Sequence, residues 1–167
     1  AQYCTPNRTG ASANTGALVV IFGGMANKFG NNPYNTGYVD YTTSAGTAKL
    51  CIGKEMWLTV QTYNSAFSPP ANMTIEAWID FDQDSIWDVG EQVLSVQNHN
   101  GLKGYPILIP VTTLPGTARL RLMVHSGVPI NDACTLIQPD GDIEDYAVEF
   151  VNCTMTPYCE PTVLISS

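Results

Sequence analysis

The sequence predicts an all-β fold: an antiparallel β-sandwich of the immunoglobulin-like or jelly-roll type, with long loops and a calcium-binding loop. Short runs carry apolar residues at every second position, turn residues separate the runs, and no helical stripe of useful length is present. The 167 residues suffice for one domain with a real core. We expect the sandwich over residues 1–152 and a C-terminal tail over residues 153–167.

The strand pattern begins at residues 17–22, a continuous apolar run typical of a buried strand. Further runs with strand patterning lie at 57–63, 75–81, 92–96, 105–111, 118–124 and 146–151. In 118–124, Arg119 and Arg121 alternate with apolar residues. They are therefore expected on the face away from the core, either as exposed charges or as partners of Glu144 or Asp145.

Residues 23–38 differ from the predicted strands. They hold four Asn and four Gly with few large aliphatic side chains. This composition predicts a long loop.

Residues 80–91 read DFDQDSIWDVGE, with acids at positions one, three, five, nine and twelve. This spacing is typical of a calcium loop, because hard cations need six to eight oxygen donors. The expected ligands are side-chain oxygens of Asp80, Asp82, Asp84, Asp88 and Glu91 and the main-chain carbonyl of Ile86. The alternative is a solvated acidic turn, in which the carboxylates would repel one another without compensation. Since both flanks read as strands, the loop is expected to be a fixed structural element and not a helix-loop-helix sensor.

Ser85 stands where such a loop prefers glycine. That position usually has a left-handed backbone, which costs a non-glycine residue on the order of 1 kcal/mol.

The charge distribution supports a cation. The chain has 15 acids and 7 bases, and nine of the acids lie in residues 80–91 and 139–146. We therefore consider a second cation site, or a buried polar cluster, formed by Asp40, Asp140, Asp142 and Asp145. The alternative is a capped turn whose acids accept backbone N–H bonds. The few scattered bases argue against nucleic acid, and no stretch reaches the roughly 18 apolar residues of a membrane span.

The five cysteines form no CxxC pair, which favours disulfides over a metal site. An oxidising compartment is then expected, and with it an extracellular or cell-surface location of a mature secreted chain. Because five is odd, one thiol is free or bonds another chain. Acceptor triplets would permit N-glycosylation at Asn7, Asn72 and Asn152.

Several motifs, in order along the chain, resemble the GEVED domain, a module of secreted bacterial proteins. They are Tyr3-Cys4-x-Pro6, the segments 37–42, 78–84, 90–91 and 118–121, and Gly141-Asp142-Ile143-Glu144-Asp145-Tyr146, the motif that names the family. The resemblance covers roughly residues 3–151, with Asp142 and Ile143 in place of the usual Glu and Val. It implies a β-sandwich with an accessory or structural role outside the cell and no catalytic activity.

The resemblance also suggests a disulfide pairing. Cys4 and Cys134 lie at recurring family positions and would pair, Cys51–Cys153 would follow, and Cys159 would remain. Spacing by itself leaves the connectivity open.

The tail repeats the start of the chain. Tyr158-Cys159-Glu160-Pro161 matches Tyr3-Cys4-Thr5-Pro6 and is followed by the apolar run Thr162, Val163, Leu164 and Ile165. Such a run could add as a strand to an exposed edge of another copy, and Cys159 could reach that partner. Head-to-tail repetition would build a fibre or surface layer. The alternatives are a linker to a following module, a shortened chain, or a tail folded back on its own domain.

A second function is also compatible with the sequence. Trp57, Trp78 and Trp87 could form a glycan-binding platform of a carbohydrate-binding or adhesion module attached to a secreted enzyme, although large aromatics in a sandwich usually pack in the core. Catalysis is not expected, since the two histidines lie in no HExxH motif and no GxSxG motif is present.

Overall fold

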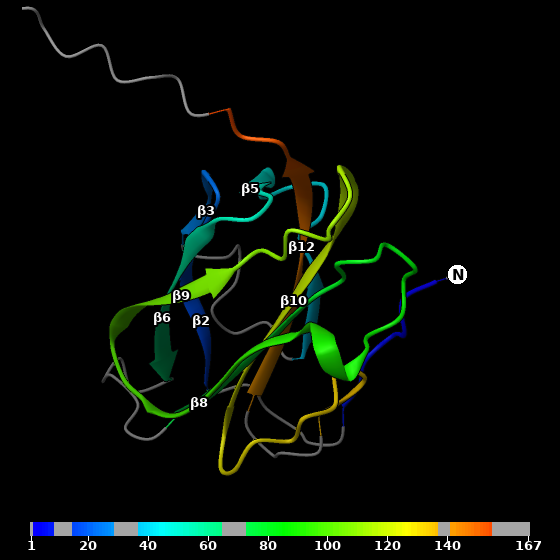
Figure 1. Cartoon of the computed structure of the whole chain (residues 1–167). Helices are drawn as coiled ribbons and strands as arrows, with labels where there is room; N and C mark the ends of the chain where they lie inside the picture. Colours follow the sequence, from blue (N-terminus) through cyan, green and yellow to red (C-terminus); the bar gives the residue numbers. More distant parts are fainter. Residues whose placement is uncertain (1, 9–14, 29–36, 65–72, 137–140, 155–167) are drawn as a thin grey trace, which may run out of the picture.

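The computed structural model describes residues 2–8, 15–28, 37–64, 73–136 and 141–154. Within these ranges the chain forms two β-sheets that pack face to face, as the predicted all-β sandwich requires (Figure 1). The larger sheet has the order β4-β12-β10-β7-β8, with β5 also paired to β12, and the smaller has the order β3-β2-β6-β9. A separate short pair joins β1 to β11.

The elements have the following bounds: β1 Asn7–Arg8, β2 Thr15–Phe22, β3 Met25–Lys28, β4 Tyr38–Asp40, β5 Thr47–Cys51, β6 Glu55–Asn64, β7 Met73–Ile79, η1 Val89–Glu91, β8 Gln92–His99, β9 Leu102–Leu108, β10 Gly116–Ser126, β11 Thr135–Leu136 and β12 Gly141–Val151. The η1 element is a single 3₁₀ turn. No helix in the described parts of the chain is long and apolar enough to cross a membrane.

Two expectations about the strands need correction. The loop predicted over residues 23–38 contains β3, because Gly23 and Gly24 take φ angles of 51° and 83° and turn the chain back within two residues. The larger sheet is also mixed, since β12 pairs in parallel with both β4 and β5 while its other ladder, with β10, is antiparallel.

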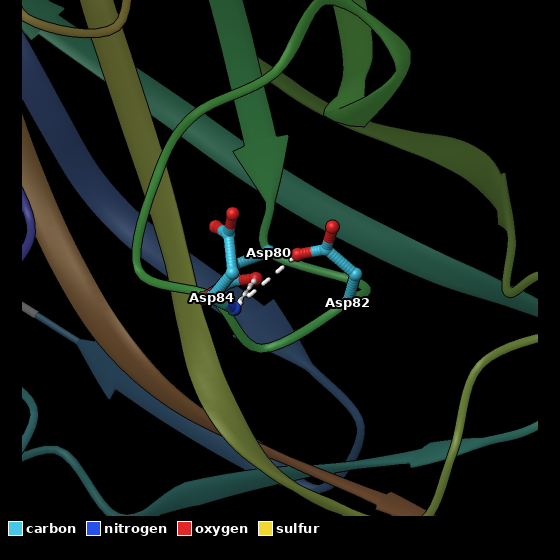
Figure 2. Close-up of side chains that lie close together, drawn as sticks. All are labelled: Asp80, Asp82 and Asp84. Carbon is cyan, nitrogen blue, oxygen red and sulfur yellow. Dashed lines mark hydrogen bonds between the residues drawn. The ribbon is translucent and has the colours of Figure 1, made fainter. Parts of the chain in front are cut away.

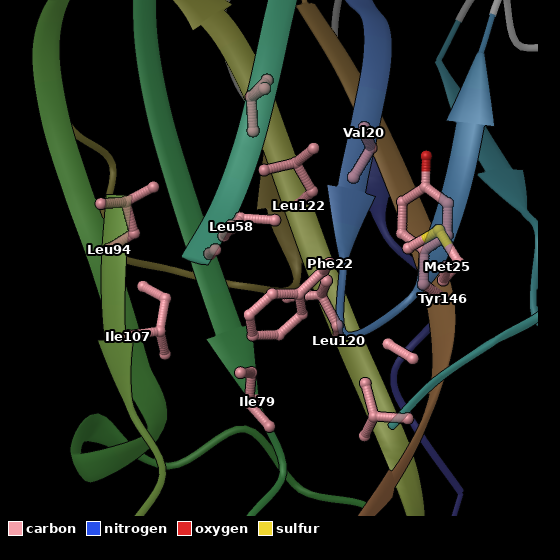
Figure 3. Close-up of a cluster of buried hydrophobic side chains, with 14 of the residues drawn as sticks. Val20, Phe22, Met25, Leu58, Ile79, Leu94, Ile107, Leu120, Leu122 and Tyr146 are labelled. Carbon is pink, nitrogen blue, oxygen red and sulfur yellow. The ribbon is translucent and has the colours of Figure 1, made fainter. Parts of the chain in front are cut away.

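The core lies between the two sheets and follows the period of two predicted from the sequence. Leu120 and Leu122 of β10 point inward against Phe22 of β2 and Leu58 of β6 (Figure 3). All four side chains are fully buried. Burial of each such side chain contributes roughly 1.5–3 kcal/mol, so this layer is the main stabilising element of the fold.

The outer face of the larger sheet is buried as well. Arg121 and His125 of β10 and Glu76 of β7 point away from the core, yet none of them is exposed. A second apolar cluster of Trp78, Met123, Ala133 and Ile143 lies on this face. Of the two readings for Arg121, exposure is wrong and pairing with Asp145 is confirmed. The N-terminal segment and the chain after β10 cover it.

Two disulfides hold the ends of the domain. Cys4 is bonded to Cys134 and Cys51 to Cys153, which are the pairs suggested by the resemblance. The first attaches the N-terminal segment to the covered outer face, and the second ties β5 to the chain just after β12. Disulfides of this kind fit the expected oxidising compartment.

The interior also contains an acidic pair on β12. Asp142 and Glu144 lie on the same side of the strand, and both are buried. Tyr146 donates its hydroxyl to Glu144 Oε2 at 2.6 Å, and Asn27 of the smaller sheet donates to the Tyr146 oxygen at 3.0 Å. Burial, followed by the charge of Asp142, raises the pKa of Glu144 well above its ordinary value of 4.5.

This pair predicts a pH-dependent loss of stability. The unfolded chain releases the Glu144 proton near pH 4.5, whereas the folded protein retains it to higher pH. The contribution of Glu144 to stability is therefore greatest below that pH and falls as the pH rises through the interval between the two pKa values. Glu144→Gln keeps the shape and removes the titration, so the variant should become increasingly more stable than the wild type from pH 4 to 8 in denaturant titrations.

Glu149→Gln is the matched control, since Glu149 lies on the opposite face of β12 and is partly exposed. Its pH profile should run parallel to that of the wild type. A Glu144→Gln profile that also runs parallel would show that Glu144 carries no perturbed titration.

Candidate metal centre

The acidic loop starts where β7 ends. Asp80 is the first residue after β7, and its side chain is fully buried. Its backbone N–H donates to the carbonyl of Arg119 on β10, which extends the contact with that strand beyond the last residue of β7. The strand therefore fixes the first expected ligand, and the loop leaves the sheet from there.

The carboxylate of Asp80 organises the loop that follows. Its Oδ1 accepts the backbone N–H groups of Gln83 at 2.6 Å and Asp84 at 3.2 Å. Its Oδ2 accepts the N–H of Ser85 at 3.1 Å. These bonds wrap the loop around one buried carboxylate, which is the type of local Asp-to-backbone bonding that favours turns.

Three acids converge at the centre of this loop. Asp80, Asp82 and Asp84 each offer a carboxylate oxygen, and these oxygens all lie within 4.8 Å of one another (Figure 2). Asp84 donates its backbone N–H to Asp82 Oδ1 at 3.2 Å. Calcium binds oxygens at 2.3–2.6 Å, so two of its ligands lie at most about 5 Å apart. The donor type and the spacing therefore fit a calcium ion.

Glu91, the expected bidentate ligand, closes the loop. Its Oε1 accepts the N–H of Phe81 at 2.7 Å, and its Oε2 accepts the N–H of Asp88 at 3.1 Å. The pKa of Glu91 is raised above its ordinary value, mainly because the side chain is buried and also because of the nearby charge of Asp80. The backbone hydrogen bonds from Asp88 and Phe81 oppose this shift. The loop thus gathers negative charge that a bound cation would stabilise.

The roles expected of Asp88 and Ile86 remain predictions. The Asp88 side chain is exposed, and Ile86 donates its N–H to Asp84 Oδ1 at 2.7 Å.

Ser85 has the left-handed conformation expected from the sequence, with a φ of 67°. Ser85→Gly should therefore raise the free energy of unfolding by roughly 0.5–1 kcal/mol, measured by denaturant titration. The control is Ser95→Gly in β8, where glycine should lower stability by roughly 0.5–1 kcal/mol. Equal losses in both variants would mean that Ser85 is not strained.

Two residues of the second expected site, Asp40 and Asp145, are paired with arginines. Asp145 is fully buried and accepts from Arg121 Nε at 2.7 Å and from Arg119 Nη1 at 3.2 Å. Arg119 also bridges to Asp40 at 3.3 Å. Asp142 lies on the opposite face of β12, beside Glu144, and Asp140 lies outside the described residues. Guanidinium groups already balance Asp40 and Asp145, and Asp142 faces the other side of the sheet, so the structure does not bring the described residues of this expected site together.

The contact between Tyr3 and the acidic loop was not predicted from the sequence. Its hydroxyl donates to Asp80 Oδ2 at 2.5 Å, and its ring lies 5.0 Å from that of Trp87 and beneath Arg119. The N-terminal segment is therefore linked directly to the acidic loop. The repeated YCxP pattern marked the N-terminal segment in the sequence, but nothing in the sequence indicated that this segment contacts the acidic loop.

The tryptophans do not form a shared platform. Trp78 is only 3% exposed and packs in the cluster on the outer face of the larger sheet. Trp87 is partly buried under Tyr3, and Trp57 lies on the smaller sheet and is 59% exposed.

Other expected sites lie partly outside the described residues. Asn152 is exposed, as an acceptor for a glycan must be, whereas the side chain of Asn7 and all of Asn72 fall outside the description. The same holds for the assembly residues Cys159, Thr162, Val163, Leu164 and Ile165. These sites remain predictions.

The fold and the loop together define a class: a disulfide-bonded β-sandwich module with an acidic loop between two strands of one sheet. Residues 74–149 match the family model of the GEVED domain, in agreement with the resemblance seen in the sequence motifs. The match runs from β7 to β12 and includes the acidic loop, Arg121 and the motif that names the family. The N-terminal motifs lie outside the match, although Tyr3 and Tyr38 contact it.

Other comparisons add little. A solved family 123 glycoside hydrolase from Clostridium perfringens, described in work on glycolipid glycan hydrolysis, aligns at 14% identity with a TM-score of 0.39. The alignment covers 72% of this chain and 24% of the hydrolase, and a similarity this low carries no argument. No curated protein matches the sequence.

Proposed function

We propose that the protein is a non-catalytic extracellular module in which a calcium ion holds residues 80–91 rigid. The observation that carries this proposal is the convergence of Asp80, Asp82 and Asp84 around one position at the end of β7. Their carboxylates, together with Glu91, would supply oxygen ligands of the kind calcium prefers. The ion would then act as a structural staple between β7 and β8.

The hydrogen bond from Tyr3 to Asp80 would extend the stabilising effect of the ion beyond the loop. Asp80 contacts the acidic loop, the strand end and the N-terminal segment at once. A cation that orders Asp80 would therefore also stabilise the covered outer face of the larger sheet.

The test is the melting temperature with calcium and with a chelator. Chelation should lower the melting temperature of the wild type, because calcium binds only the folded loop. Asp82→Ala should abolish the difference, whereas Asp132→Ala, an exposed acid outside the loop, should retain it. Identical melting curves with and without chelator would refute the calcium staple.

We further propose that copies of the module associate head to tail through the C-terminal tail. Of the five cysteines in the sequence, four form the two disulfides, which leaves Cys159 for a bond to a partner. An intermolecular disulfide would have to use it, and the apolar residues 162–165 follow it directly. Strand addition to an edge of another copy would build a fibre or surface layer.

Deleting residues 163–167 should leave a folded protein that no longer assembles, as judged by light scattering and electron micrographs. A truncated chain that assembles as well as the wild type would rule out strand donation. The alternative is a carbohydrate-binding or adhesion accessory module of a secreted enzyme, for which the exposed Trp57 is the available aromatic surface. Binding on a glycan array that Trp57→Ala abolishes would favour it.

A further inference from the structure

The outward face of the smaller sheet carries apolar side chains from three neighbouring strands. The register of β2, β6 and β9 places the following residues on this face: Val19, Ile21, Trp57, Leu102, Pro106 and Leu108. Trp57 and Leu102 are each 59% exposed, and Leu108 is 67% exposed. Exposed apolar surface that continues across several strands is typical of a surface that binds a partner.

Trp57 is held in place on this face by its neighbour on β9. A Cβ atom at Gly104 would lie 3.0 Å from Cε3 and 3.6 Å from Cζ3 of the indole, so the ring occupies the space that a side chain at Gly104 would need. Because the ring already packs against the sheet, a partner that covers it would restrict little further side-chain freedom. Tryptophan is also one of the residue types that contribute most to protein–protein binding.

Two charged residues lie at opposite corners of this face. Lys28 is the last residue of β3, one edge of the sheet, and pairs with Val19. Glu55 is the first residue of β6 and pairs with Leu108 of β9, the other edge. Both charged side chains are exposed. In the described parts of these four strands, no other charged residue points outward, since Lys103 pairs with the buried Val60.

This face is neutral in a chain that is otherwise acidic. The chain has 15 acids and 7 bases, and the acidic loop and the acids of β12 belong to the larger sheet. On the outward face of the smaller sheet, Lys28 balances Glu55. Two copies of the chain therefore repel each other through much of their surface but can approach through this face.

We propose that two copies of the chain associate through the outward face of the smaller sheet. Such a contact is isologous, with the same surface used on both copies and a two-fold axis between them. An axis in the plane of the interface that exchanges the two charged corners places Lys28 of each copy opposite Glu55 of the other. The apolar residues between the corners are then buried on both copies. The C-terminal tail takes no part, so this contact goes beyond the head-to-tail association proposed above.

Sedimentation velocity of the full chain with calcium, over a series of concentrations, tests the contact. Trp57→Ala should weaken association at least about tenfold. Lys28→Glu and Glu55→Lys should each weaken it about fivefold, and the double variant should recover it, because the two charges again face opposite charges. Lys49→Glu and Glu149→Lys make the same charge changes on the larger sheet and should associate normally.

A carbodiimide cross-link locates the contact directly. In a mixture of unlabelled and isotope-labelled chains, the cross-link should join Lys28 of one chain to Glu55 of the other. Absence of this mixed cross-link, a Trp57→Ala chain that associates as well as the wild type, or a double charge reversal that recovers nothing would each overturn the proposal. A monomeric chain whose Trp57 binds a sugar on a glycan array would also overturn it. Deleting residues 163–167 tests the tail separately and should leave this contact intact.

Discussion

Replacing Arg121 with alanine should lower the free energy of unfolding by about 3–5 kcal/mol, since it removes the bidentate partner of a buried carboxylate and leaves Arg119 as its only cation. Arg121 is fully buried and donates to Asp145 twice, from Nε to Oδ1 at 2.7 Å and from Nη2 to Oδ2 at 2.8 Å. It also donates to the carbonyls of Ala133 at 2.9 Å and Cys4 at 3.1 Å. One side chain therefore joins β10, β12 and the N-terminal segment. Denaturant titration with calcium present and the disulfides intact measures the loss.

Two further variants calibrate this result. Lys49 and Glu149 form an exposed pair at 4.0 Å, and Lys49→Ala should cost less than about 1 kcal/mol. Replacing Arg121 and Asp145 together with Met and Leu should recover part of the loss, because no charge is left buried. An Arg121→Ala protein within 1 kcal/mol of the wild type would show that the buried pair does not hold this face together.

The second large effect is expected from the disulfide between Cys4 and Cys134. It joins residues 130 positions apart, and a cross-link of that span stabilises a fold by about 5 kcal/mol in the chain-entropy account. Replacing both cysteines with serine should cost at least that much. The loss should be larger still, because the bond holds the Cys4 carbonyl against Arg121.

The other disulfide provides the comparison. Cys51 and Cys153 lie 102 positions apart, so the chain-entropy effect of removing them should be nearly the same. The excess loss in the Cys4 and Cys134 variant should disappear when Arg121 is already replaced, which a double-mutant cycle measures. Equal losses for the two disulfides would mean that the N-terminal segment and Arg121 are not coupled.

Strands with a clear period of two could be predicted from the sequence. Leu120, Leu122 and Val124 face the core as their spacing requires, and β2 was identified from its apolar run. The hairpin to β3 carried a usable signal, since Gly23-Gly24 is a favoured two-residue turn. The parallel pairing of β4 and β5 with β12 could not be predicted, because the residue pattern of a short strand does not indicate which distant strand it pairs with.

The acidic loop between two strands was predictable for a similar reason: its acids lie within twelve consecutive residues, so their spacing can be read directly from the sequence. The contacts between distant segments could not be predicted in the same way. Period-two patterning placed Arg121 away from the core but could not show that the N-terminal segment covers it. The Tyr3 hydroxyl reaches Asp80 from a segment that the Cys4–Cys134 bond joins to a distant part of the chain.

Calcium binding by the loop is the central claim, and calorimetric titration of chelator-treated protein with calcium tests it most directly. The loop geometry predicts one strongly bound ion per wild-type chain and no binding to Asp82→Ala, because Asp82 is one of the three converging acids. Asp145→Asn, outside the loop, should still bind one ion, provided that it folds. No calcium uptake by the folded wild type, or equal uptake by Asp82→Ala, would contradict the claim.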